Sequence, residues 1–332
     1  MKIKKSVTRT IKKLPYLREL FLERDQLRTQ FRQEFPPGHY SSPYPCIEEI
    51  KRKEIDIFDR IPRTIPAIDL NHEQQLALFQ NFKELYREQP FDVHKKPGVR
   101  YFFENTSYGS HDAIVLYCFI RQTAPKRIIE IGSGYSSCVI LDVNELFFGN
   151  GISCTFVDPN PDRLLSLITD RDKANVRIIQ SDVQDVGLNP FLELDAGDIL
   201  LIDSSHVAKI NSDVNYLFFE VLPRIRSGVY VHIHDIGYPF EYWKEWIYAG
   251  RTWNEAYVLR AFLQYNNAFK IQYFNSFIAQ FHRDELAKEM PLCLRDTGGS
   301  IWIKKVSNPE IDHRPLKAPS QVQQRDTACF GV

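Results

Sequence analysis

Several features that mark other protein classes are absent from this sequence. Its 42 basic and 42 acidic side chains cancel, so the whole chain has no electrostatic preference for nucleic acid or a membrane surface. No apolar run approaches the roughly 20 residues that a membrane-spanning helix needs. The first thirteen residues are basic, which favours a solvated arm, and they lack the apolar stretch of a secretory signal.

Paired cysteines are absent as well. The sequence has no C-x-x-C motif, which argues against a disulfide framework or a zinc cluster and indicates reduced thiols in a cytoplasmic protein. It also has no internal repeat or low-complexity tract. The six cysteines are scattered: Cys46, Cys118, Cys138, Cys154, Cys293 and Cys329.

The N-terminal third is helical and interrupted. Helical spacing over residues 14–35 ends at FPPGHYSSPYPC (35–46), and helices are expected over 47–58 and 71–88, with Asn71 and Gln74 as a capping box. These helices are too short and polar to bury a core alone. We therefore expect residues 1–105 to form an extension that acts as a lid or acceptor pocket, with 36–44 over the strand ends.

From residue 126 onward, short β-branched runs alternate with helical segments. This pattern predicts an α/β fold, a Rossmann-like doubly wound, mostly parallel seven-stranded sheet with helices on both faces. The domain should span residues 106–310, followed by a tail at 311–332. The strands are expected in RIIEI (127–131), SCTFVD (153–158), VRIIQSD (176–182), DILLID (198–203), GVYVHIHD (228–235), FKIQYF (269–274) and SIWIKKV (300–306).

The segment EIGSGYSS (130–137) joins the first strand to a helix. Gly132 and Gly134 permit a tight turn close to a ligand, and Ser136 is placed to cap the helix. The third glycine of a dinucleotide fingerprint is missing, since position 137 is Ser. Glu130 is also unfavourable beside a pyrophosphate and better suits a cationic or hydroxyl-rich ligand.

Carboxylates end the next two strands. Asp158 is placed to accept hydrogen bonds from a ribose diol, and Asp182 from an adenine amino group. Any one acid here can be a helix cap, but acids at three successive strand ends predict a nucleoside site.

These residues resemble the class I S-adenosylmethionine-dependent methyltransferases. IPAIDLNHEQQLALF (65–79), HDAIVLYCFIRQTAPKRIIEIGSGYSS (111–137), DILLIDSSHVAKINSDVNYLFFEVLP (198–223), GVYVHIHDIGYPFEYWKEW (228–246) and WNEAYVLRAFLQYN (253–266) are similar to a bacterial group labelled methyltransferase family 24. The resemblance implies the fold, S-adenosylmethionine as cofactor and methyl transfer. The predicted cofactor residues are Glu130, Gly132, Ser133, Gly134, Tyr135, Ser136, Asp158, Asp182 and Asp203.

The fifth strand, VYVHIHDIG (229–237), carries polar groups that a buried strand tolerates only when something binds them. His232 lies deeper and is expected to be a core histidine. His234 and Asp235 sit at the rim beside Asp203, because the fourth and fifth strands are neighbours in this fold.

This arrangement resembles that of metal-dependent catechol-type O-methyltransferases. The resemblance places Asp203, His234 and Asp235 on the metal ligands and His206 on the base, which makes His206, His234 and Asp235 the catalytic candidates. Imidazole in an oxygen ligand's place favours Fe, Zn, Ni or Mn over Mg. Either such a metal is bound, or His234 and Asp235 form a metal-free pair that handles protons.

The leading hypothesis is methyl transfer to a hydroxyl of a small molecule, with an amine or activated carbon as alternative acceptors. No nucleic-acid or membrane partner is expected, and a homodimer is left open. A nicotinamide-dependent oxidoreductase and a non-catalytic cofactor-binding scaffold are the competing readings. Weaker candidates are Tyr108 and His111, which precede the first strand, and Glu255, expected simply in the first turn of a helix.

Overall fold

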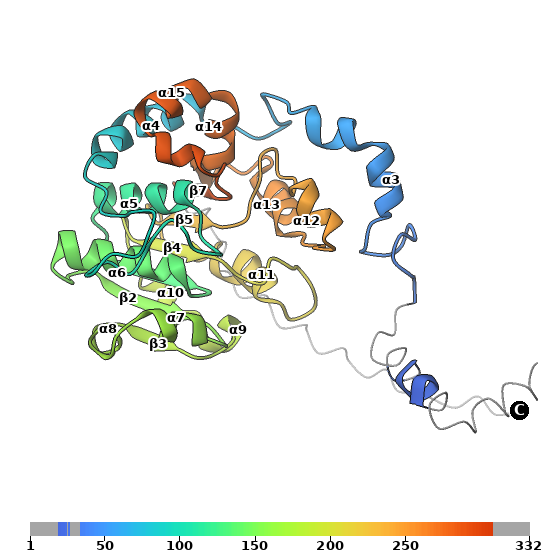
Figure 1. Cartoon of the computed structure of the whole chain (residues 1–332), viewed down its shortest axis with the longest axis horizontal. Coiled ribbons are helices and arrows are strands. Elements are labelled where there is room, and N and C mark those ends of the chain that lie inside the picture. Colours follow the sequence, from blue (N-terminus) through green and yellow to red (C-terminus); the bar gives the residue numbers. More distant parts are fainter. Residues whose placement is uncertain (1–18, 25, 27–33, 308–332) are drawn as a thin grey trace, which may run out of the picture. The chain divides into compact units, whose positions relative to one another are not determined.

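The computed structural model describes residues 19–24, 26 and 34–307 (Figure 1). These residues form two compact units. One unit comprises the residues up to Ile61 together with Tyr242–Thr252, and the other comprises Pro62–Glu241 and the residues from Trp253 on. The predicted basic arm, most of the helix expected over 14–35 and the tail at 311–332 lie outside the described residues.

The larger unit contains the predicted sheet. Its seven strands follow the order β3-β2-β1-β4-β5-β7-β6, with only the pairs that involve β7 antiparallel among them. The expected doubly wound, mostly parallel sheet is therefore confirmed. The strands are β1 (Arg127–Ile131), β2 (Ser153–Val157), β3 (Arg177–Ile179), β4 (Ile199–Ile202), β5 (Tyr230–Ile233), β6 (Phe269–Phe274) and β7 (Ile301–Lys305).

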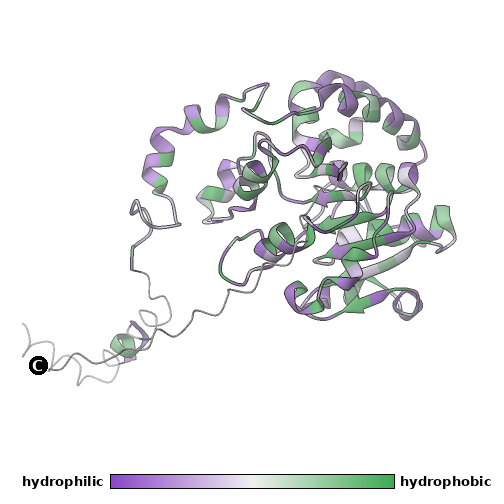
Figure 2. Ribbon diagram, turned by 180° about the vertical axis from the view of Figure 1, so that it is seen from behind, coloured by the Kyte–Doolittle hydropathy of each residue, from purple (hydrophilic) through white to green (hydrophobic). Residues whose placement is uncertain are grey.

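Helices connect and flank these strands. Hydrophobic residues gather in the sheet and on the helices beside it (Figure 2). No helix among the described residues is long and apolar enough to cross a membrane. The helical elements are α3 (Ile47–Arg52), η1 (Ile55–Asp59), α4 (His72–Tyr86), α5 (Ser110–Thr123), α6 (Tyr135–Phe148), α7 (Asp162–Leu167), α8 (Asp170–Asn175), α9 (Val183–Val186), α10 (Asn189–Leu192), α11 (Asp213–Tyr216), η2 (Leu217–Val221), α12 (Lys244–Tyr248), α13 (Glu255–Leu263), α14 (Asn275–Phe281), α15 (Arg283–Glu289) and η3 (Pro291–Leu294).

Strand alternation assigns helices to the two faces of the sheet. On one face, Trp302 of β7 stacks on Phe119 of α5, with ring centroids 3.8 Å apart. On the other, Phe269 of β6 packs against Phe262 of α13. Because successive side chains of a strand point to opposite faces, α5 and α13 approach the polar end of β5 from opposite sides.

Residues 62–105 belong to the larger unit, whereas the predicted boundary stood at residue 105. The reason is packing: Phe82 of α4 is fully buried and contacts Phe119 and Tyr273. The predicted capping box at Asn71 is wrong, because this residue has a φ of 52° and its side-chain amide donates instead to the carbonyl of Ile271. The lid role of residues 1–105 stays a prediction.

Arg100 joins the chain ahead of α5 to α6 and α8. Its guanidinium donates to the carboxylates of Asp142, Glu145 and Asp172, and the Asp142 side chain is completely buried. Asp142 also accepts from the main-chain amides of Arg100 and Tyr101. Removal of the arginine would leave buried carboxylates without their counter-charge.

We therefore expect Arg100→Ala to lower the free energy of unfolding by about 3–5 kcal/mol, the usual cost of breaking a buried ion pair from one side. Arg224→Ala is the control, since Arg224 pairs with Glu220 at the surface and such pairs contribute under about 1 kcal/mol. Urea denaturation of both variants measures the difference, and equal losses would contradict a structural role for this cluster.

Candidate active site

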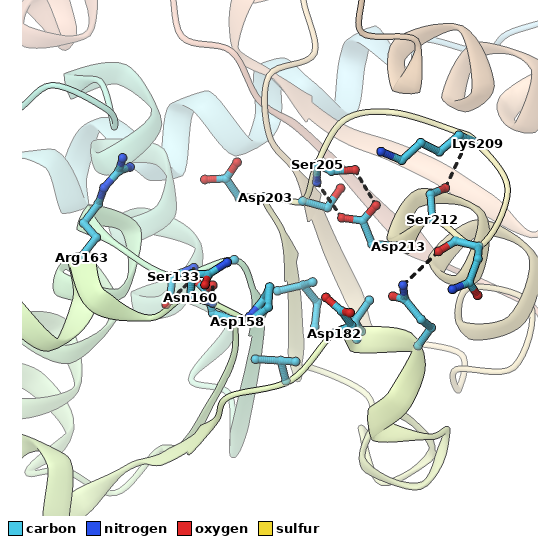
Figure 3. Close-up of a pocket in the computed structure, with 18 residues that line it drawn as sticks. Ser133, Asp158, Asn160, Arg163, Asp182, Asp203, Ser205, Lys209, Ser212 and Asp213 are labelled. Atoms are coloured by element: carbon cyan, nitrogen blue, oxygen red, sulfur yellow. Dashed lines mark hydrogen bonds between the residues drawn. The ribbon is translucent and has the colours of Figure 1, made fainter. Parts of the chain in front are cut away.

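A pocket of about 570 Å³ lies where β1, β2, β3 and β4 end (Figure 3). In open parallel sheets ligands bind at this edge, where the strand order reverses. Here β1 has β2 on one side and β4 on the other. The lining residues are Ile131, Gly132, Ser133, Val157, Asp158, Pro159, Asn160, Arg163, Asp182, Val183, Gln184, Asp203, Ser204, Ser205, Lys209, Asn211, Ser212 and Asp213.

Acidic side chains outnumber basic ones in this lining. A pocket of this kind favours a ligand that is positively charged or rich in hydroxyl groups. The Asp213 carboxylate is partly engaged, since the amide and hydroxyl of Ser205 both donate to it. The charged lining residues are Asp158, Asp182, Asp203 and Asp213 against Arg163 and Lys209.

Gly132 stands at the closest approach of the strand ends. Its φ is 81°, and a Cβ at this position would lie 1.9 Å from the carbonyl oxygen of Asp203, so no other residue fits. Gly134 is different, because a Cβ there would meet only the flexible Cδ of Arg163, at 3.1 Å. The turn thus requires one glycine absolutely and the other only weakly.

Asp158 holds the glycine turn from the end of β2. The amide and hydroxyl of Ser133 donate to Oδ2 at 2.9 and 2.8 Å, and the amide of Asn160 donates to Oδ1. Its carboxylate therefore faces the pocket from a fixed position, with lone pairs left for a ligand.

Five of the nine predicted cofactor residues line the pocket: Gly132, Ser133, Asp158, Asp182 and Asp203. Gly134, Tyr135 and Ser136 do not, nor does Glu130.

Glu130 is fully buried beneath the start of α6, where the Ser137 hydroxyl donates to it. Burial raises its pKa to about 8. Ser137, not the predicted Ser136, supplies the side chain that accepts from the amide of Gly134 ahead of the helix.

The end of β5 sends its polar groups to both faces of the sheet. His232 and His234 stack 5.6 Å apart on the side of α5, and His234 also stacks on Tyr108 at 4.9 Å. Asp235, with a φ of 57°, turns toward His206, which lies beside α13. Asp235 therefore lies between two histidines, with Oδ2 3.4 Å from Nε2 of His206 and Oδ1 3.5 Å from Nε2 of His234.

His206 is surrounded by three carboxylates. Nε2 lies 3.3 Å from Oδ1 of Asp203 and 3.4 Å from Oδ2 of Asp235, while Nδ1 is 2.8 Å from Oε2 of Glu255. The His206 ring is buried. The main chain of His206 has a φ of 60°, a conformation that non-glycine residues rarely adopt unless their surroundings hold them.

The electrostatics of this cluster demand positive charge at its centre. Burial disfavours the charged ring, but hydrogen bonds with Asp203 and Glu255 raise the pKa of His206 to about 10. This arrangement therefore favours a protonated His206 ring, and the role of His206 as the base stays a prediction. The compensating charge comes either from a proton on the ring or from a cation between the groups.

The residues that can hold a metal ion differ from the prediction in one member. Donor atoms of Asp203, His206 and Asp235 all lie within 4.8 Å of one another. His234, which was predicted as a ligand, is not in this group. Its Nε2 lies 3.5 Å from the other carboxylate oxygen of Asp235, Oδ1. An imidazole and two carboxylates are a donor set that suits Mn, Fe, Ni or Zn.

Some residues of the site were missed by the sequence interpretation. Glu255 does open α13, as expected, but its contact with His206 spans 49 positions of the chain, and no spacing rule signals it. Arg163, Lys209 and Asp213 follow strands two and four and could have been found by examining each loop after a strand. Tyr108 and His111 are buried and do not line the pocket.

Comparison with known sequences supports a methyltransferase. A family model described as a methyltransferase domain matches residues 129–236, which include the glycine turn and the end of β5. An uncharacterized protein of Archaeoglobus fulgidus is 35% identical over 167 residues, which cover 48% of this chain and 74% of that relative.

Similar solved structures include two methyltransferases. One is the methyltransferase PaMTH1 of Podospora anserina bound to S-adenosylhomocysteine, 13% identical, with 83% of this chain and all of that one covered and a TM-score of 0.40. The other is the O-methyltransferase TomG of Streptomyces achromogenes, involved in tomaymycin synthesis and in complex with S-adenosylmethionine, 12% identical, with 78% and 96% covered and a TM-score of 0.38.

Gly132→Ala should destabilise the protein by about 1–3 kcal/mol or more, because the added methyl group meets a main-chain oxygen and the residue has a positive φ. Gly134→Ala is the matched control and should cost much less, since the side chain of Arg163 can move. Thermal and urea unfolding of the two variants test this. A Gly132→Ala protein as stable as the control would show that the turn can relax.

Proposed function

We propose that this chain, which belongs to the family of class I S-adenosylmethionine-dependent methyltransferases, is a small-molecule methyltransferase. It transfers the methyl group of S-adenosylmethionine to a hydroxyl of its acceptor. The acceptor meets the cluster of Asp203, His206 and Asp235. One observation carries the proposal: Asp203 both lines the cofactor pocket and contacts His206. The site that holds the methyl donor therefore adjoins the cluster that can activate an acceptor.

The pocket's chemistry supports this donor. S-adenosylmethionine has a sulfonium and an ammonium against one carboxylate, so its net charge is positive, and the lining is acidic. We assign the ribose diol to Asp158 and the adenine amino group to Asp182, which follow neighbouring strands. Asp203 then lies on the side of the methionine part, next to the glycine turn.

A nicotinamide dinucleotide fits the same pocket poorly. Its pyrophosphate would have to lie among carboxylates, with Ser in place of the third glycine at position 137. Among the residues that line the pocket, only Arg163 and Lys209 are cations. The oxidoreductase reading is therefore disfavoured by charge.

The reaction needs alignment and a deprotonated acceptor. The acceptor oxygen attacks the methyl carbon in line, the C–S bond breaks with its electron pair left on sulfur, and S-adenosylhomocysteine is released. The hydroxyl must lose its proton to a nearby group, and a histidine–carboxylate cluster supplies such groups. His206 and His234, which both lie beside Asp235, are our candidates for this base.

The cluster also fits a divalent metal. Asp203, His206 and Asp235 would hold it, and His206 already uses Nδ1 toward Glu255, which leaves Nε2 for the ion. Such an ion, when bound, lowers the pKa of a coordinated hydroxyl and orients it. The imidazole favours a transition metal over magnesium.

Removal of the Asp158 carboxylate should weaken the cofactor site. We expect Asp158→Ala to cost about 1.5–3 kcal/mol of binding free energy for S-adenosylhomocysteine, the usual contribution of hydrogen bonds to a charged acceptor, or roughly a tenfold to hundredfold higher Kd. Calorimetric titration measures it. Asp162→Ala, an exposed acid of α7 outside the pocket lining, is the control. Unchanged affinity in Asp158→Ala would remove this residue from the cofactor site.

Chelation tests the metal separately from the cofactor. Protein purified without chelator should contain near-stoichiometric Mn, Fe, Ni or Zn by elemental analysis. Treatment with EDTA should abolish transfer of labelled methyl groups to a small-molecule extract, yet leave the Kd for S-adenosylhomocysteine within about twofold, because the ligands other than Asp203 lie outside the pocket lining. Full turnover by a metal-free protein would contradict the proposed metal dependence. The histidine–carboxylate cluster would then have to deprotonate the acceptor without a metal.

A further inference from the structure

Glu255 is a buried acid whose position in the first turn of a helix explains only part of its surroundings. The side chain is completely buried, and Oε2 lies 2.8 Å from Nδ1 of His206. Its other oxygen, Oε1, is buried with no hydrogen-bond partner among the described residues. A buried carboxylate is costly unless it is paired, so the contact with His206 is the main compensation for its charge.

The main chain reinforces this contact. The amides of Asn254 and Glu255 both donate to the carbonyl of His206, at 3.1 and 3.2 Å. The Asn254 side chain accepts from the amide of Ala208 and donates to its carbonyl. The start of α13 therefore uses its otherwise unpaired amides to hold the loop that carries His206.

The contact also determines which ring nitrogen faces the other carboxylates. Glu255 is an acceptor, so Nδ1 must carry a proton and donate it. Nε2 then points to Asp203 and Asp235 at 3.3 and 3.4 Å. When Nε2 is unprotonated, it and one oxygen each of Asp203 and Asp235 offer three lone-pair atoms within 4.8 Å of one another, close enough to hold one cation.

We infer that Glu255 is a positioning residue that fixes the tautomer and orientation of His206, so that Nε2 completes a divalent-cation site with Asp203 and Asp235. The inference rests on the metal in the proposed function and deepens it. A carboxylate on the second nitrogen of a ligating histidine is a general device that strengthens the ligand, and its removal commonly weakens metal affinity tenfold to hundredfold.

A merely structural Glu255 would behave differently. In that case the loss of Glu255 would lower the free energy of unfolding. The affinity for the cation would then decrease only because less of the protein is folded. A positioning role requires that the effect act through His206, so it must vanish when that ring is already absent.

The test uses the full-length chain, stripped of metal and freed of chelator, with Mn²⁺ as the probe in calorimetric titrations. Glu255→Ala should weaken Mn²⁺ binding by about tenfold to hundredfold, and Glu255→Gln should weaken it less, because its amide oxygen still accepts from Nδ1. The Kd for S-adenosylhomocysteine should stay within about twofold in both, which shows that the fold is intact. Asp284→Ala, which removes an acid from the first turn of α15, is the control and should bind Mn²⁺ like the parent.

A double-mutant cycle supplies the second readout. In the His206→Ala background, Glu255→Ala should change the Kd for Mn²⁺ by less than about twofold. An undiminished effect in that background overturns the inference, as does a Glu255→Ala protein that binds Mn²⁺ like the parent. If Glu255→Ala also loses S-adenosylhomocysteine binding, Glu255→Gln decides: parental Mn²⁺ affinity in it overturns the inference, and a weaker affinity supports it.

The proposed function fails in a distinguishable way. A parent protein that binds S-adenosylhomocysteine but takes up neither Mn²⁺ nor Zn²⁺ removes the metal from the proposed function, and the role of Glu255 with it. A parent that binds Mn²⁺ with no dependence on Glu255 leaves the proposed function intact and overturns only the inference.

Discussion

The contact between the turn after β1 and the end of β4 is the constraint on which the site depends. A Cβ on Gly132 would lie 1.9 Å from the carbonyl oxygen of Asp203, and the amide of Asp203 donates to the carbonyl of Ile131 at 2.8 Å. The hydrogen bond holds the main chain of Asp203 against the glycine turn, and the missing side chain at position 132 permits this close approach. The Asp203 side chain can therefore line the pocket and still reach His206.

Charge compensation organises the rest of the site in two different ways. In the pocket, carboxylates such as Asp158 are held by neutral donors, so a positively charged ligand remains free to satisfy them. Around His206, three carboxylates share one imidazole, and that point needs a cation or a proton. The pocket and the cluster around His206 thus use the same residue type in two electrostatic settings that meet at Asp203.

Much of the fold followed from local pattern. The seven short, mostly apolar runs that were predicted as strands contain strands of three to six residues, because a strand covered on both faces needs little more than successive apolar side chains. The places of Asp158, Asp182 and Asp203 followed as well, since parallel strands bring their carboxyl ends to one edge. The burial of Glu130 was not foreseeable, because one position along β1 decides whether a side chain faces the pocket or the helix behind it.

The sequence by itself determined the strands, the glycine turn and the set of acids at the sheet's edge, because these depend on short-range pattern and on the topology that it implies. Only the tertiary structure decided that His206 and not His234 lies among the carboxylates. Alternation sends His234 toward Tyr108 and turns Asp235 toward α13, and Glu255 reaches His206 across 49 positions of the chain. Partners that distant are selected by the packing of whole helices against a sheet, and no local spacing encodes that choice.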